Sequence, residues 1–553
     1  MNSISNQKKP TMMIIGVDGC TFDILNKYMD RGLLPNFSRL MKEGAYGRLR
    51  STIPPGSPAA WSTFQTGKDP GKHGIFDFFR NVPENYTYTP VNATFLKEET
   101  FWKRLSRLGK SVGVVNFLFT YPPSQVNGYV VSGKETPSEQ AAYACPETIK
   151  EDILKAEPGF EVDPFKRITH SREFLMGVIK KLEVQERVNR HLIKQHPTDL
   201  FMSMFAVPDV IQHLFWHHMD ETHVLHDPKK AKQYTPLIEN IFQTLDGFIG
   251  NRLQLLEDDA TVVVVSDHGF CNLAKIVQMN KWFQDNGLMF LRKPENSRMS
   301  FVVQQLKKAD RFLSQFDRFG LRRKLKLRTG EMRRNYAKAN LIDWSRTRAY
   351  MGRISEGGIF CNLKGREKFG IVSPGKEYEE LRDEIIKKLR SLKDPETGQT
   401  VFKNVYKRED LYQGVYVKYA PDIILETGDH PYLEGDSLLC PRLFEPLTKG
   451  SLSGKHHPDG ILMVSGKGVR KNHRLTDIHI RDVAPTVLYM MDEKVPVDMD
   501  GSVISELFDP ETVNARPVEF DHDIQPVQEA SEMIYDADQS EEIEKRLKDL
   551  GYL

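Results

Sequence analysis

The chain has 553 residues, which is long for one compact core, so we expect one large domain with insertions or two domains. Charged residues make up 27% and the formal net charge is +2, which gives no overall indication of nucleic acid or membrane binding. No apolar run approaches the ~18 residues of a membrane-spanning helix. The five cysteines are scattered and form no Cys-x-x-Cys pair, which argues against a disulfide framework or thiolate metal site. We therefore expect a cytoplasmic protein.

Strands and helices alternate through the first half of the chain. Strands are predicted at 11–19, 111–117, 128–133, 199–207 and 262–265, and amphipathic helices at 173–195 and 234–256. The four consecutive valines at 262–265 lack the alternation of a half-exposed strand, which indicates a central strand buried on both faces. Strands alternating with helices at this spacing predict βαβ units and an α/β fold with a mostly parallel sheet.

The composition changes from about residue 277 to residue 350. The segment 301–340 carries twelve lysines and arginines against three acids, a local charge of +9, with phenylalanines interleaved. We interpret it as part of an inserted helical cap. A solvated basic surface is the simplest explanation of this charge. A funnel for an anionic substrate, or contact with an acidic lipid surface, is the alternative.

Strands resume after this insertion at 357–363, 420–427 and 460–466, with helices at 377–392 and 477–491. The tail is acidic and ends in a short amphipathic segment. We divide the chain into a first part of a catalytic core (1–276), a basic helical cap (277–350), a second part of the core (351–510), and a C-terminal arm with a short helix (511–553).

Carboxylate and imidazole side chains lie near the ends of several predicted strands. Four motifs supply them: Asp18 in IIGVDG, Asp209 and His213 in VPDVIQH, Asp267 and His268 in VSDHGF, and the adjacent His456 and His457 in SGKHHPDG. Asp209 and His213 are four residues apart, which places both on one face of a helix. Carboxylates and neutral imidazoles without thiolates suit zinc or manganese, and three of each are enough for two ions. Paired ions of this kind promote displacement at phosphorus.

A candidate nucleophile lies in the segment 51–79. Ser57 precedes Pro58, which suits the first turn of a helix, so we expect Ser57 to be the N-cap beside free backbone N–H groups. A helix N-terminus favours phosphate, and a metal bound to the hydroxyl would make it a nucleophile. The simpler alternative is a capping serine without chemistry.

Six segments in order along the chain resemble sequence blocks of one protein family. They are IIGVDG, SPAAWSTFQTGKDPGKHGIFDF, PDVIQH, VSDHGF, GKHHPDGILMVSGKGV and DVAPTVLYMM. From about residue 11 to residue 510 the chain resembles the alkaline phosphatase superfamily, and within it the type I phosphodiesterase/nucleotide pyrophosphatase group and its phosphohydrolase/phosphomutase-like subgroup. The resemblance implies a mostly parallel sheet sandwiched by helices and two divalent metal ions. We expect zinc, with manganese as the alternative, because the ligands are carboxylates and imidazoles.

The resemblance also implies a role for each residue of the motifs. One metal would be held by Asp209, His213 and His456, and the other by Asp18, Asp267, His268 and the hydroxyl of Ser57. The catalytic residue Ser57 would attack phosphorus and form a covalent phosphoserine intermediate. The family pattern favours His213 and His456 over their neighbours His217 and His457. His73 is expected to have a structural role behind the nucleophile helix.

Our leading hypothesis is a two-metal, metal-dependent phosphoric ester hydrolase that cleaves phosphodiesters or phosphomonoesters of a small molecule. A phosphomutase acting on a phosphorylated sugar or acid would use the same residues, and a metal-stabilised membrane-surface binding protein is the non-catalytic alternative. Serine in place of the threonine common in nucleotide pyrophosphatases weakens the expectation of a nucleotide diester. Lys134, Arg353 and Lys455 lie near the predicted site, but each is more often an ordinary surface residue. No nucleic acid partner is expected, and the oligomeric state stays open.

Overall fold

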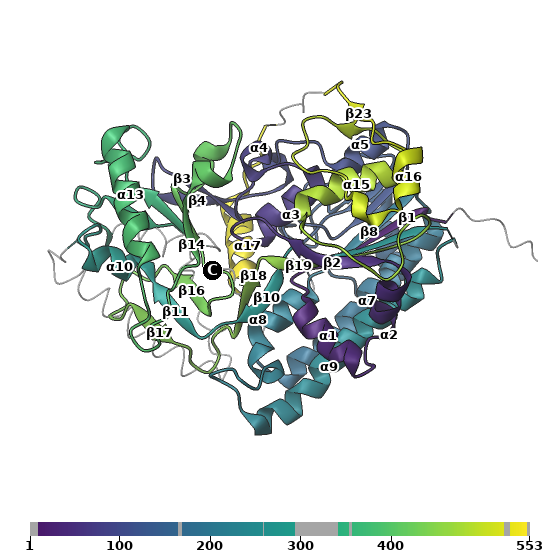
Figure 1. Cartoon of the computed structure of the whole chain (residues 1–553), viewed down its shortest axis with the longest axis horizontal. Coiled ribbons are helices and arrows are strands. Elements are labelled where there is room, and N and C mark those ends of the chain that lie inside the picture. The colour runs from purple at the N-terminus through teal and green to yellow at the C-terminus, as the bar shows by residue number, and fades with distance from the viewer. Residues whose placement is uncertain are drawn as a thin grey trace, which may run out of the picture.

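The computed structural model describes residues 9–163, 169–257, 259–292, 341–352, 357–524 and 531–549. Within them a large central sheet flanked by helices forms one lobe, and a smaller mixed lobe lies beside it (Figure 1). The basic segment predicted at 301–340 lies outside the described residues. No helix in the described part of the chain is long and apolar enough to span a membrane.

In the described part of the chain, the central sheet has ten strands. Their order is β20 (His473–Arg474), β2 (Ala45–Arg50), β19 (Asp459–Ser465), β9 (Thr261–Val265), β1 (Met12–Val17), β8 (Leu200–Phe205), β5 (Val112–Val115), β6 (Gly128–Val131) and β7 (Ala144–Cys145), and β21 (Ile478–His479) also pairs with β2. The strands from β9 to β6 in this order are mutually parallel, whereas β19 is antiparallel to β9 and β2. The expected mostly parallel α/β sheet is confirmed.

The central strands are apolar because both of their faces are covered. Every residue of β1 and β8 is buried, and so are the four valines of β9. In β1, Met12 lies between Leu200 of β8 and Thr261 of β9, so the three strands end at neighbouring positions. Polar residues that follow these strands are therefore brought together at one edge of the sheet.

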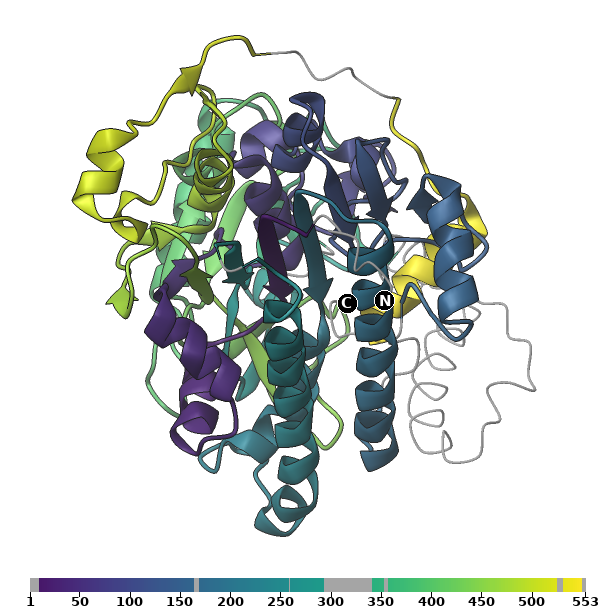
Figure 2. The same ribbon diagram turned by 90° about the vertical axis from the view of Figure 1, so that its right-hand side faces the viewer.

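Two groups of helices cover the sheet. One contains α3 (Ser57–Thr66), α5 (Phe101–Arg107) and α15 (Val483–Met490), which contact one another. The other contains α1 (Phe22–Asp30), α2 (Pro35–Glu43), α6 (Glu147–Ala156), α7 (Arg172–Gln195), α8 (Val207–Met219) and α9 (Pro228–Leu253). Figure 1 shows the first group above the sheet and α1, α2, α7, α8 and α9 below it, and Figure 2 shows the long helices α7 and α9. The sheet is therefore sandwiched by helices, as expected.

The smaller lobe has its own hydrophobic core. Its elements are β11 (Lys275–Gln278), α10 (Met279–Asp285), β12 (Ala349–Met351), β13 (Gly358–Cys361), α13 (Lys376–Arg390), β14 (Asn404–Lys407), α14 (Arg408–Leu411), β15 (Ile423–Glu426), β16 (Tyr432–Gly435) and β17 (Phe444–Pro446). The core runs from Val277 to Leu438 along the chain and includes Tyr86 of the large lobe. This core therefore includes residues of the predicted cap (277–350) and of the predicted second part of the catalytic core (351–510). The four-part division of the chain stays a prediction.

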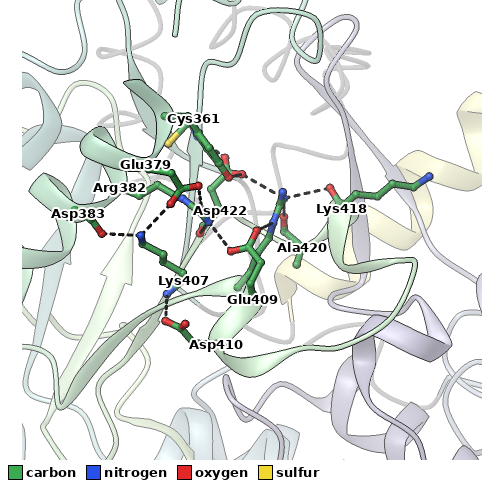
Figure 3. Close-up of polar contacts among 12 residues, drawn as sticks. Cys361, Glu379, Arg382, Asp383, Lys407, Glu409, Asp410, Lys418, Ala420 and Asp422 are labelled. Atoms are coloured by element: carbon green, nitrogen blue, oxygen red, sulfur yellow. Dashed lines mark hydrogen bonds and ion pairs between the residues drawn. The ribbon is translucent and has the colours of Figure 1, made fainter. Parts of the chain in front are cut away.

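A buried carboxylate ties the smaller lobe together. Asp422, which is 0% exposed, receives two hydrogen bonds of 2.7 Å from Arg366, one of 2.6 Å from the Tyr378 hydroxyl and one of 2.7 Å from the Cys361 amide. Arg408 approaches it to 3.2 Å. Charges on α13 and α14 surround this group (Figure 3). Because the buried carboxylate is paired with arginines and hydrogen-bonded to Tyr378 of α13, the network fixes α13 against the β13–β15 strands.

The C-terminal segment returns to the large lobe. Its helix α17 (Ala537–Asp549) lies where the sequence predicts a short helix, and packs against β4 (Thr87–Pro90). Ile543 and Leu547 join the main hydrophobic core. Residues more than 400 positions apart in the chain thus meet beside the sheet (Figure 2).

Candidate active site

The ends of two neighbouring parallel strands supply three polar side chains. Asp18 follows β1, and Asp267 and His268 follow β9. The Gly19 amide donates to Asp267 Oδ1 over 3.2 Å, which ties the two strand ends together. Gly19 has φ +70°, and a Cβ there would lie 3.0 Å from the Asp209 Cα, so only glycine allows this close approach.

The neighbouring strand β8 is followed directly by helix α8. Asp209 lies in its first turn and His213 one turn later, on the face that points to the strand ends. The Gln212 side-chain amide donates to Gly19 O over 2.6 Å and to Pro208 O over 3.0 Å. This residue therefore fixes the start of α8 against the loop after β1.

His456 reaches the site on a short strand of its own. β18 (Gly454–His457) pairs antiparallel with β10 (Gly269–Asn272), and Phe270 lies opposite His456. No sequence pattern indicates this pairing, because the strand is only four residues long and contains adjacent polar groups. The pairing stacks the His456 ring on the His268 ring, with the centroids 3.8 Å apart.

The first candidate metal group consists of Asp209, His213 and His456. The Nε2 atoms of the two histidines are 2.9 Å apart, and Asp209 Oδ1 lies 3.3 Å from one and 3.2 Å from the other. His213 Nδ1 is 3.2 Å from the Gly454 carbonyl, which can only accept, so this nitrogen carries the proton. Its Nε2 lone pair is therefore directed at the other two side chains.

The second group surrounds Ser57, and its members are 0% exposed. His268 Nε2 lies 3.1 Å from Ser57 Oγ, 3.5 Å from Asp18 Oδ1 and 3.4 Å from Asp267 Oδ2. Ser57 Oγ is also 3.4 Å from Asp18 Oδ1. His268 Nδ1 donates to the Gly269 carbonyl over 3.0 Å, which leaves Nε2 as the nitrogen facing the group. Asp209 belongs to the first group, and it can also hold a metal ion together with Asp18 and His268.

Ser57 is the first residue of α3, and Gly56 is the N-cap. The expectation that Ser57 itself caps the helix is therefore wrong by one position. The physical reason is that Pro58 fits the second helical position as well as the first, because neither amide has a partner within the helix. The hydroxyl still lies at the positive end of the helix dipole, which favours negative charge on it.

The buried carboxylates repel one another. Burial raises the pKa of Asp18 well above its ordinary value, and the carboxylates of Asp267 and Asp209 raise it further. Burial also raises the pKa of Asp267 to about 6, although the hydrogen bond from Gly19 opposes the rise. Oδ2 of Asp18 and Oδ2 of Asp267 receive no hydrogen bond from the described residues. In the part of the chain that the structure describes, nearby positive charge opposes the rise in the pKa of Asp18 only in part.

The imidazoles do not supply enough of that charge. Burial, followed by the nearby His456, lowers the pKa of His268 to about 4, so its ring is neutral at pH 7. Burial alone would raise the pKa of Asp209, but charge and hydrogen bonds from His213 and His456 bring it well below its ordinary value. Neutral Nε2 lone pairs and under-satisfied carboxylates that converge in a buried space fit divalent cations.

The neighbouring histidines lie elsewhere. The ring centroids of His217 and His218 are 3.9 Å apart, and His457 Nδ1 accepts from the Asp459 amide over 3.2 Å. Neither His217 nor His457 belongs to the groups of possible metal ligands among the described residues. His73 Nδ1 accepts from the Ile75 amide over 3.2 Å, so its Nε2 carries the proton and donates to Thr63 Oγ1 over 3.0 Å. His73 thus fixes the segment after α3, in line with its expected structural role.

Sequence reasoning missed the residues that hold the site loops in place. Ser266 Oγ accepts from the Cys20 amide over 2.8 Å and donates to the His268 carbonyl over 2.7 Å. Gln212 links α8 to the loop after β1. Ser266 and Gln212 are polar residues in segments whose other side chains are mostly apolar, and each lies next to a candidate ligand. This combination is the signal that could have identified them.

A known protein family matches most of the chain. The model of the type I phosphodiesterase / nucleotide pyrophosphatase family matches residues 12–459. No curated protein matches.

Three solved structures are similar over most of the chain. Human ectonucleotide pyrophosphatase / phosphodiesterase 5 has 14% identity and a TM-score of 0.47, covering 91% of this chain and 100% of that one. The murine protein, as an inactive variant in complex with AMP, has 14% identity and a TM-score of 0.49 over the same shares. Phosphonoacetate hydrolase from Sinorhizobium meliloti 1021, in complex with phosphonoacetate, has 15% identity and a TM-score of 0.49, covering 86% of this chain and 94% of that one.

Proposed function

Because the chain belongs to the type I phosphodiesterase / nucleotide pyrophosphatase family of metal-dependent hydrolases, we propose that it cleaves phosphate esters of small molecules through Ser57. The observation that carries the proposal is the position of the Ser57 hydroxyl. It lies 3.1 Å from His268 Nε2 and 3.4 Å from Asp18 Oδ1, at the start of a buried helix. A buried serine with only a capping role would have no reason to face a carboxylate and an imidazole.

The residues divide into two proposed metal sites. One consists of Asp209, His213 and His456, and the other of Asp18, Asp267, His268 and Ser57. Divalent ions bound there would lower the pKa of the hydroxyl and of water, and would neutralise charge on the phosphate. Zinc is the proposed metal and manganese the alternative, because the donors are carboxylates and imidazoles without thiolates.

The proposed reaction has two displacement steps at phosphorus. Ser57 Oγ forms a bond to phosphorus while the bond to the leaving alcohol breaks, and the alcohol departs with the electron pair and takes up a proton. Water then attacks phosphorus, the Oγ–P bond breaks, and the serine hydroxyl is restored. The N-terminus of α3 favours the negative charge that develops on Oγ and on the phosphate oxygens.

Activity and metal content of the wild type and of Ser57→Ala test the proposal. We expect about two divalent ions per chain and hydrolysis of p-nitrophenyl phosphate or bis-p-nitrophenyl phosphate. Turnover should fall at least about 1,000-fold in Ser57→Ala, because the nucleophile is removed. Ser62→Ala is the matched control, since Ser62 is a buried serine of the same helix. Activity that survives in Ser57→Ala, or a protein that binds no metal, would contradict the proposal.

Two finer points remain proposals. The cytoplasmic location rests on the five cysteines, none of which forms a disulfide in the structure, and cell fractionation tests it.

Contact of the segment 301–340 with an acidic lipid surface rests on its charge of +9. Flotation with acidic vesicles should then fall steeply as salt is raised.

A further inference from the structure

The loop between β2 and α3, residues 51–56, carries the proposed nucleophile at its end. Its start is held by the large lobe, because the Ser51 amide donates to the Pro458 carbonyl over 2.8 Å. Pro54 and Pro55 have no amide hydrogen, so neither can fix the middle of the loop by donating a hydrogen bond. The middle of the loop therefore depends on its carbonyl groups and on side-chain packing.

Tyr412, which follows α14 of the smaller lobe, reaches the middle of this loop. Its side chain is buried, and its hydroxyl donates to the Ile53 carbonyl. Burial raises the pKa of this hydroxyl, so it keeps the proton that it donates. The ring lies beside Phe76, with the centroids 5.2 Å apart, and Ala420 and Ile424 of the smaller lobe complete a small hydrophobic cluster around it. The two lobes therefore meet at the loop that precedes the nucleophile.

The same segment of the smaller lobe also contacts the other end of the nucleophile helix. There, α4 (Pro70–His73) follows α3 and packs against it. Asp69 Oδ1 accepts from the Gly71 amide over 2.7 Å and from the Gln413 amide over 3.1 Å. The Tyr416 amide donates to the Gly71 carbonyl over 2.9 Å. Residues on both sides of α3 are thus held by one short segment of the smaller lobe.

A pocket between the lobes places this loop at the candidate active site. It is lined by Pro54 and Pro55, by the metal ligand His456 and its neighbour, and by residues 425–428 and 433–434 of the smaller lobe. The loop that Tyr412 contacts is therefore one wall of a hollow that reaches a metal ligand. A shift of this wall would be transmitted directly to the start of α3.

We propose that Tyr412 is a positioning residue for the nucleophile: by fixing the Ile53 carbonyl, it keeps the Ser57 hydroxyl aimed at phosphorus. This inference rests on the proposed function. A displacement of a reacting group by about 1 Å can slow a reaction by about 100-fold, so one hydrogen bond four residues before the nucleophile is enough to affect the rate. The smaller lobe thereby contributes to the step in which the Oγ–P bond forms and the alcohol departs.

The test compares the metal-loaded wild type with Tyr412→Phe, which keeps the ring and removes the donor. The substrate is whichever of p-nitrophenyl phosphate and bis-p-nitrophenyl phosphate the wild type hydrolyses faster. We expect kcat to fall roughly 5- to 10-fold, as for loss of one hydrogen bond, and KM to change less than about 2-fold. Unchanged kcat, or a rise in KM as large as the fall in kcat, would overturn the inference.

Tyr489→Phe is the matched control. The Tyr489 ring is buried in the large lobe, and its hydroxyl donates to the Arg516 carbonyl over 2.7 Å. This variant loses the same kind of hydrogen bond, but at a place from which no contact leads to the loop 51–56. It should keep the wild-type kcat. An equal fall in kcat for Tyr489→Phe would mean that any lost tyrosine hydroxyl slows the enzyme, and would overturn the special role of Tyr412.

Two binding measurements and a single-turnover experiment distinguish positioning from damage to the site. Tyr412→Phe should keep the wild-type metal content, and calorimetry should give an affinity for inorganic phosphate within about 2-fold of the wild type. Rapid quenching of a single turnover should show that the phosphoserine forms roughly 5- to 10-fold more slowly. Loss of metal, or clearly weaker phosphate binding, would assign Tyr412 a merely structural role. Failure of the proposed function would appear differently, as wild-type turnover that persists in Ser57→Ala.

Gly414→Ala tests the contact at the other end of α3. Gly414 has φ +123°, and a Cβ there would lie 2.4 Å from the Gly71 carbonyl, so alanine should push the segment away from α4. We expect kcat to fall at least as much as in Tyr412→Phe, and the two effects to be less than additive in the double variant. Gly398→Ala is the control, because Gly398 has φ +71° but nothing lies within 4 Å of a Cβ. Wild-type kcat in Gly414→Ala, or full additivity, would show that the segment does not act on the nucleophile as a unit and would overturn the inference.

Discussion

Asp209 is the residue on which both candidate metal groups depend. Its Oδ1 lies 3.3 Å from His213 Nε2 and 3.2 Å from His456 Nε2, and 4.0 Å from His268 Nε2 in the second group. The motif VPDVIQH indicates a metal ligand at this position. It does not indicate that the Asp209 carboxylate lies between the two candidate metal groups. That position depends on the close approach of the Asp209 backbone to Gly19, which no local pattern encodes.

Asp209→Asn should therefore affect both metals at once. The amide keeps the size and one acceptor oxygen but removes the negative charge that binds a cation. We expect loss of more than one ion per chain and a fall in activity beyond roughly 100-fold, which exceeds the cost of changing an outer-shell partner. Elemental analysis of the purified protein and ester hydrolysis measure the two effects. Asp220→Asn, at the C-cap of the same helix, should change neither, and full metal content in Asp209→Asn would rule out the assignment.

The sequence predicted which side chains lie close together better than it predicted the backbone that carries them. Asp18, Asp267 and His268 were expected at strand ends, and the structure places them there, because a buried strand followed by polar residues is a local pattern. The strand β18 and the first helical position of Ser57 were not expected. Pairing of short strands depends on long-range contacts, and helix ends shift by a residue without a change in pattern.

At the scale of elements, the approach of α8 to β18 brings His213 beside His456. A Cβ at Gly454 would lie 2.4 Å from the Gln212 carbonyl of α8, so glycine allows this contact. Gly454→Ala should push β18 away from the helix. We expect clearly weaker metal binding and a loss of about 1–3 kcal/mol in the free energy of unfolding, as for other overpacked sites.

Two measurements check this prediction on the same sample. Metal affinity comes from competition with a chelator, and stability from urea unfolding of the metal-free protein. Gly247→Ala is the control, because nothing lies within 4 Å of a Cβ at this position of helix α9. It should leave metal affinity unchanged. Wild-type metal affinity in Gly454→Ala would contradict the prediction. It would show that α8 and β18 can separate without moving His213 and His456.

At the scale of the whole molecule, the sequence predicted the layers but not the extent of the second lobe. Alternating strands and helices were enough to predict the mostly parallel sheet and the helices on it. The apolar segments at 357–363 and 420–427 were also expected to be strands, and β13 and β15 lie there. They pair with each other outside the central sheet. An apolar strand pattern indicates burial but not which sheet the strand joins, so lobe membership could not be read from the sequence.

The stability of the large lobe should depend on pH through a histidine that is neutral when folded. Burial lowers the pKa of His73 to about 3, against about 6.5 for an unfolded chain. Between these values the unfolded state binds a proton that the folded state does not, so the free energy of unfolding decreases as pH falls below 6.5. The contribution is about 1.4 kcal/mol per pH unit, or roughly 2 kcal/mol between pH 6.5 and 5. Above pH 6.5 it is constant.

His73→Gln should remove this part of the acid sensitivity while it lowers stability at pH 7.5, because the hydrogen bonds to Thr63 and Ile75 are disturbed. Urea unfolding with a chelator present, at pH 7.5, 6 and 5, measures the slope without interference from bound metal. The slope below pH 6.5 should be shallower than in the wild type by about 1.4 kcal/mol per unit. The exposed His522, changed to glutamine, should leave the slope unaltered. An identical slope in His73→Gln would mean that the buried ring takes up a proton without unfolding, and that the segment after the nucleophile helix opens locally before the lobe unfolds.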